Sequence, residues 1–125
     1  AGNVTEVTCT YDPATRGGNA PDNRQVKGTI HWVSAATAVS TEVRLYDRLF
    51  TDPQPDAGGK DYLESLNPDS LKIATAIVEP SLASALPDAK FQFERLGYFV
   101  ADQVDHAAGN PVFNFAVGLK DSFGK

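Results

Sequence analysis

The feature that most limits the fold of this sequence is a set of short segments in which apolar and polar residues alternate. In residues 26–32, apolar residues and a glycine fill one set of alternate positions, whereas Lys27, Thr29 and His31 fill the other. Side chains of a β-strand point alternately to opposite faces of a sheet, so this period of two predicts half-buried strands. Six segments are predicted to be strands on this basis: residues 4–11, 26–34, 42–46, 71–79, 90–100 and 111–119.

The predicted strands are separated by segments rich in turn-forming residues. Residues 12–25 and 51–61 contain many Gly, Pro, Asn and Asp residues and predict surface loops. Helical structure is expected only in short turns, at residues 62–66 and in a segment that Pro80 begins. Because no long amphipathic helix is predicted, the expected fold class is all-β, as a barrel or a sandwich.

Composition agrees with one soluble globular unit. The 125 residues are 42% apolar, Cys9 is the single cysteine, and no apolar run approaches the ~18 residues of a membrane span. An internal disulfide and a zinc site of several cysteines are excluded, and a cytoplasmic location is expected. The net charge of −5 counts against a nucleic-acid partner, although a local basic patch can coexist with an acidic remainder. The tightest basic group is Arg44 with Arg48.

Residues that could carry catalysis are sparse. His31 and His106 have no metal-site or catalytic-triad spacing, so His31 is expected to be a hydrogen-bonded structural residue and His106 an exposed loop residue. Glu79 and Glu94 could form a glycosidase pair, but nothing in the sequence singles them out. No glycine-rich phosphate-binding loop opens a helix. These residues favour a binding module over an enzyme.

Three parts of the sequence, two of them made of two strings each, resemble a known protein family. They are VKGTIHWVSA (26–35) with EVRLYDRLF (42–50), EPSLA (79–83) with FQFERLGYF (91–99), and PVFNFAVGLKDSF (111–123). In this order and at these spacings they closely resemble the C-terminal anticodon-binding region of glutaminyl-tRNA synthetases, which also has a string like NPDSL (67–71). The resemblance covers almost the whole chain.

The resemblance implies a fold and a function. The family has closed or partly open six-stranded barrels with short helical turns, similar to a ribosomal protein that binds 5S RNA. Residues 1–125 would form the anticodon-binding region of a longer class I glutamine–tRNA ligase, following its catalytic domain and a proximal barrel. The expected partner is glutamine tRNA, with no DNA or membrane partner. ATP and Mg²⁺ would bind the parent's catalytic domain, so this region has no expected cofactor and would not aminoacylate alone.

The resemblance also implies particular site residues. Gln92 and Arg95 match the positions that read the middle anticodon base, a uridine. A Gln amide offers a donor and an acceptor and Arg offers donors, which suits the pairing edge of uracil. Positions 92 and 95 of a regular strand point to opposite faces, so Arg95 is expected to lie at a bend or bulge, which the nearby Gly97 makes possible. Without RNA, Gln92 would simply be exposed, and Arg95 would pair with Glu94 or Asp121.

Two positions depart from the family pattern, where arginine is usual. Phe115 could stack on a base or pack in the core, and Lys120 keeps the charge but loses the bidentate fork. Lys120 is therefore a candidate contact for the RNA backbone.

The main alternative is a structural or protein-interaction barrel with no RNA contact. In that case Trp32, Phe50 and Tyr98 would pack in the core or at an interface between domains, and the surface around Arg95 would be acidic.

Overall fold

The computed structural model describes residues 2–15, 20–25, 28 and 30–119, and these fall into two compact units, Ala1–Ile30 and His31–Lys125. The described part of the first unit has one short 3-10 turn, η1 (Pro13–Thr15), and an ion pair between Asp12 and Arg24. The expectation of a strand at residues 4–11 is wrong, because these residues form no ladder and their apolar side chains are exposed.

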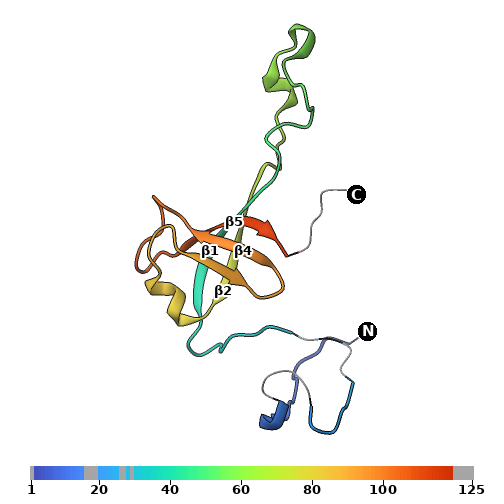
Figure 1. Ribbon diagram of the computed structural model, residues 1–125, viewed down its shortest axis with the longest axis vertical. Coiled ribbons are helices and arrows are strands. Elements are labelled where there is room, and N and C mark those ends of the chain that lie inside the picture. Colours follow the sequence, from blue (N-terminus) through green and yellow to red (C-terminus); the bar gives the residue numbers. More distant parts are fainter. Residues whose placement is uncertain (1, 16–19, 26–27, 29, 120–125) are drawn as a thin grey trace. The chain divides into compact units, whose positions relative to one another are not determined.

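The second unit contains a five-stranded mixed sheet (Figure 1), with strand order β2-β1-β5-β4-β3. Its strands are β1 (Val39–Tyr46), β2 (Leu71–Val78), β3 (Lys90–Phe93), β4 (Gly97–Ala101) and β5 (Val112–Gly118). β1 runs parallel to β5, whereas the other neighbours are antiparallel. The expected all-β class and the strands at 42–46, 71–79 and 111–119 are confirmed.

The described strands do not close into the expected six-stranded barrel. Of the segment 26–34, residues 28 and 30–34 belong to no strand, and the remaining three lie outside the described residues. Ile30 and Trp32 are largely exposed, so the alternating pattern there has no covering layer in the described structure. The segment 90–100 is also not one strand but two, β3 and β4, joined by a turn at residues 94–96.

In the part of the chain that the structure describes, helical structure is limited to short 3-10 turns, as expected. η3 (Tyr62–Ser65) begins after Asp61, whose carboxylate accepts a hydrogen bond from the backbone N–H of Leu63, and η4 (Pro80–Ser84) begins with proline. η2 (Ala57–Gly59) and η3 lie in a long arm, residues 47–70, that projects from the ends of β1 and β2 in Figure 1.

Aromatic side chains on one face of the sheet make the core. Val43, Phe99, Ala101 and Phe113 are buried there, and the rings of Phe93 and Phe99 stack with centroids 4.3 Å apart. Phe115 packs against this cluster, with its ring 5.3 Å from that of Phe99, so it serves the core. We call this face of the sheet the core face and the opposite one the outer face.

His106 is buried, and its expected position as an exposed loop residue is wrong. Only 5% of its surface is exposed, because the ring lies between β5 and the segment after η4. Nδ1 accepts a hydrogen bond from the backbone N–H of Val112 (3.2 Å), and Nε2 lies 3.0 Å from the carbonyl oxygen of Ala85. The histidine therefore ties the loop before β5 to the η4 segment.

Gly97 is required by a close approach between β4 and β5. A Cβ atom at this position would lie 2.5 Å from the carbonyl oxygen of Val117 and 2.8 Å from a ring carbon of Phe115. The backbone φ of +156° is also one that residues with a side chain rarely adopt. The strand β4 can therefore begin here only with glycine.

Replacing Gly97 with alanine should lower the free energy of unfolding by about 3 kcal/mol or more, because strain at φ is added to overpacking. Gly109→Ala is the matched control, since Gly109 has a φ of +83° but no atom near its added Cβ. The Gly109 substitution should lower the free energy of unfolding by about 1 kcal/mol. Urea unfolding measures both, and equal losses would contradict the close approach.

Candidate nucleic-acid interface

The hairpin of β3 and β4 holds the residues predicted to read a base. In β3, Phe91 and Phe93 are partly buried against the core, whereas Lys90 and Gln92 are exposed. Because side chains alternate along a strand, Lys90 and Gln92 lie on the outer face. The packing of the two phenylalanines thus fixes the direction in which the Gln92 amide is presented.

Arg95 lies in the tight turn between the two strands. The backbone N–H of Leu96 donates a hydrogen bond to the carbonyl oxygen of Phe93 (3.0 Å), and Arg95 has a φ of +66°. This left-handed conformation is uncommon for a residue other than glycine, asparagine or aspartate. The expected bend at Arg95 is therefore confirmed, and Gly97 begins the strand that follows.

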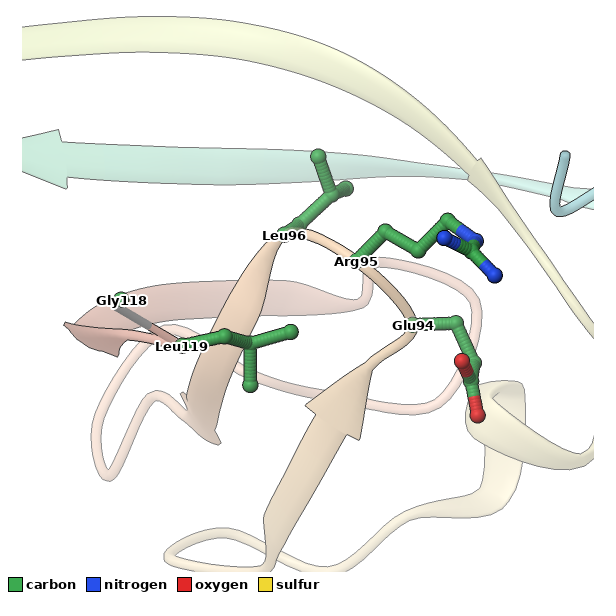
Figure 2. Close-up of a pocket in the computed structure, with 5 residues that line it drawn as sticks. All are labelled: Glu94, Arg95, Leu96, Gly118 and Leu119. Atoms are coloured by element: carbon green, nitrogen blue, oxygen red, sulfur yellow. The ribbon is translucent and has the colours of Figure 1, made fainter. Parts of the chain in front are cut away.

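Figure 2 shows the side chains around this turn. Arg95 extends away from Leu119, which projects from the end of β5, and Leu96 points in another direction. The five labelled residues line a pocket of about 680 Å³: Glu94, Arg95, Leu96, Gly118 and Leu119. Lys120, the third candidate residue, lies outside the described residues.

Gln92 lines a different pocket from Arg95. This second pocket, of about 240 Å³, lies between the ends of β2 and β3, the two outermost strands of the sheet. Glu94 and Leu96 line both pockets, so the two adjoin at the turn. The structure places the two predicted readers three residues apart on one hairpin, but not in one pocket.

Unpaired cations distinguish this hairpin from the rest of the described chain, although Glu94 also lies in its turn. Arg24, Arg44, Arg48, Lys60 and Lys72 each lie within 4.0 Å of a carboxylate oxygen. Lys90 and Arg95, in contrast, form no ion pair with any residue that the structure describes, and both are exposed. In particular, the expected ion pair of Arg95 with Glu94 does not form, and Asp121, the alternative partner, lies outside the described residues. The hairpin thus offers two cations to an outside partner.

The second pocket also contains the two carboxylates considered for a glycosidase. Glu79 and Glu94 both line it, with apolar side chains such as Phe91 and Leu82. Glu79 is 3.4 Å from Nε2 of His31, which lies outside any strand and is half exposed. Among the described residues, no group of three or more His, Cys, Asp or Glu side chains could hold a metal ion.

An ion-pair cluster lies on the same outer face, around Arg44 of β1. The guanidinium of Arg44 is 2.7 Å from Glu42, 2.7 Å from Asp105 and 3.4 Å from Asp102. The hydrogen bonds to Glu42 and Asp105 raise the pKa of Arg44. Arg44, the strand member of the basic group seen in the sequence, is therefore surrounded by more negative charge than it carries.

Asp102 joins this cluster to the loop between β4 and β5. Its carboxylate accepts hydrogen bonds from the backbone N–H groups of Asp105 (2.8 Å) and Val104 (2.9 Å) and from the Asn114 amide (2.7 Å). The bond from Asp105, followed by those from Asn114 and Val104, lowers the pKa of Asp102 to about 2. These bonds favour the ionised carboxylate, and thus the folded loop.

The cluster predicts how stability depends on pH. The pKa of Asp102 is lower in the folded than in the unfolded state. Its contribution to the free energy of unfolding is therefore complete above pH 4 and is lost as the pH falls toward 2. Asp102→Asn should therefore reduce the change in unfolding free energy across this pH range by about 2 kcal/mol. Urea unfolding of both proteins between pH 2 and 5 measures this, with Asp47→Asn as an exposed control. Parallel profiles would contradict it.

Comparison with known proteins assigns the chain to a family. The family described as "tRNA synthetases class I (E and Q), anti-codon binding domain" matches residues 29–102, which include the whole hairpin of β3 and β4. The chain belongs to this family of anticodon-binding domains. Within the described residues, no helix is long and apolar enough to cross a membrane.

Similar curated proteins are named glutamine–tRNA ligase. The chain is 59% identical to that of Ralstonia nicotianae and 60% identical to that of Cupriavidus metallidurans, each over 125 residues. It is 55% identical to that of Vibrio parahaemolyticus over 124 residues. Each alignment covers 99% of this chain but 22% of the relative. The chain thus spans about a fifth of the length of these relatives.

Proposed function

We propose that this chain is the anticodon-binding region of a glutamine–tRNA ligase, and that its β3–β4 hairpin reads the middle anticodon base. The observation that carries the proposal is the charge on this hairpin. Lys90 and Arg95, which form no ion pair within the described chain, flank the exposed Gln92. Phosphate attraction and a base-reading amide are thus combined on one short element.

The chemistry of Gln92 and Arg95 suits uridine. Uracil presents two carbonyl acceptors and an N3–H donor, so a glutamine amide can pair with adjacent groups of opposite character. Arg95 has donors only, and it would bind a carbonyl or a phosphate oxygen. Since they line adjoining pockets, the base would have to lie across the turn for both residues to contact it.

The backbone conformation of Arg95 supports a binding role for this residue, because the conformation does not serve the stability of the fold. A non-glycine residue in the left-handed region costs about 1–2 kcal/mol, and glycine would avoid this cost. The exposed Arg95 side chain makes no hydrogen bond or ion pair with the described residues that would offset the strain. Such strain at an exposed turn is typical of functional positions.

The rest of the parent function follows from the relatives and is likewise proposed. The parent would attach glutamine to its tRNA with ATP and Mg²⁺ bound in a separate catalytic domain. The alternative of a barrel without RNA contact requires no cations at the hairpin, and the charge distribution there favours RNA. A hydrolase built on Glu79 and Glu94 is less favoured, since the family match is to a binding domain.

Gln92→Ala should weaken discrimination between glutamine tRNA and a variant with a changed middle base, by about tenfold, because two hydrogen bonds to the base are lost. Titration at low salt measures both affinities. Gln103→Ala, which removes an exposed amide from a distant loop, should leave discrimination unchanged. If the unmodified chain binds both tRNAs equally, the reading role of the hairpin is wrong.

Arg95→Gly should move stability and binding in opposite directions. The unfolding free energy should stay constant or rise by up to ~1 kcal/mol, because glycine relieves the left-handed backbone. Affinity for tRNA should fall, and the slope of log affinity against log salt should drop by about one. Arg48→Gly removes the same charge from a residue paired with Asp47, and it should change the slope little. Equal salt slopes for the two variants would count against Arg95.

A further inference from the structure

The outer face of the five described strands carries two aromatic residues, and both are tyrosines. The phenylalanines of β3, β4 and β5 all pack in or against the core, whereas Tyr46 and Tyr98 are exposed. Tyr46 is held in place, because its hydroxyl donates a hydrogen bond to Oδ1 of Asn114 (3.1 Å). Tyr98 makes no hydrogen bond through its hydroxyl and contacts no other aromatic ring among the described residues.

Tyr98 lies directly beside Gln92. The register of β3 and β4 pairs the two residues, and directly opposed residues have their Cβ atoms about 4.5–5.5 Å apart. On its other side, Tyr98 pairs with Val117 of β5, which is also exposed. The tyrosine ring, 45% of whose residue surface is exposed, thus lies between an amide and a small apolar side chain.

An exposed aromatic ring beside an amide is an arrangement that suits a nucleobase. A base splayed out of an RNA loop can stack on the ring while its pairing edge is hydrogen-bonded by the neighbouring side chain. Phosphates on either side of that base would meet Lys90, which shares this face, and Arg95 in the turn.

We infer that Tyr98 is the stacking platform for the base whose edge Gln92 reads. This inference rests on the proposed function and adds a residue to the site. The ring, not the hydroxyl, is the group that contacts the base, so phenylalanine can replace tyrosine here and an aliphatic side chain cannot. A stacking role also accounts for an exposed aromatic residue on the outer face, where Tyr98 contributes little to the core.

The inference is tested with a glutamine-tRNA anticodon stem-loop that carries 5-iodouridine at the middle position. This base keeps the pairing edge of uridine and crosslinks under near-ultraviolet light to an aromatic side chain stacked against it. Peptide mapping should find the crosslink at Tyr98 in the unmodified chain and at the same position in Tyr98→Phe. Because this measurement needs no destabilising variant, it stays decisive even if other substitutions at the site unfold the chain.

Affinity measurements provide the second test. Tyr98→Leu should bind the stem-loop at least about fivefold more weakly, which is the low end for loss of one base–aromatic stack, and Tyr98→Phe should stay within twofold. Tyr46→Leu is the matched control, because it removes a comparably exposed tyrosine from the same outer face and should also stay within twofold.

The outcomes separate this inference from the proposed function. A crosslink at another residue, or Tyr98→Leu affinity within twofold of the unmodified chain, would overturn the stacking role while Gln92-dependent discrimination still stands. If the unmodified chain does not discriminate the middle base at all, the proposed function fails, and the stacking inference fails with it. The stacking role would also be overturned if Tyr46→Leu lost as much affinity as Tyr98→Leu, since the loss would then not be specific to position 98.

Discussion

The packing of aromatic side chains on the core face of β3, β4 and β5 determines most of what the outer face presents. Phe93 stacks on Phe99, and Phe113 makes edge contacts with Phe91 and Phe93. Because these rings occupy one set of alternate positions, the residues between them must face solvent. Lys90, Gln92 and Tyr98 therefore owe their exposure to the core, and a one-residue slip in register would bury all three.

The turn depends on a second constraint, the close approach at Gly97. Phe115 packs so near the start of β4 that only glycine fits there, and this fixes where the hairpin reverses. The three residues before it must then complete the turn, and Arg95 takes the left-handed conformation. Phe115, at a position where the glutaminyl-tRNA synthetase family usually has arginine, is thus a core residue that helps to shape the turn.

The sequence predicted the class of the fold, three of its strands and the short helical turns, because these depend on local alternation and turn chemistry. It did not predict that residues 90–100 form two strands. The core positions 91, 93, 97, 99 and 101 are all odd, so alternation continues unbroken across the three-residue turn and hides the reversal. His106 was misjudged because its partners, Ala85 and Val112, are 21 and 6 residues away and no local pattern reveals them.

Net charge was a poor guide to the candidate site for a related reason. The value of −5 describes the whole chain, whereas the interaction with a phosphate depends on which cations are already paired. In β1, Arg44 is neutralised by Glu42, Asp102 and Asp105, so this member of the basic group visible in the sequence is not free to bind a phosphate. These three carboxylates lie on β1 and in the loop after β4, whereas Lys90 and Arg95 of the hairpin have no acidic partner among the described residues. An acidic chain can therefore still present unpaired cations to a polyanion, as the proposed function requires of the hairpin.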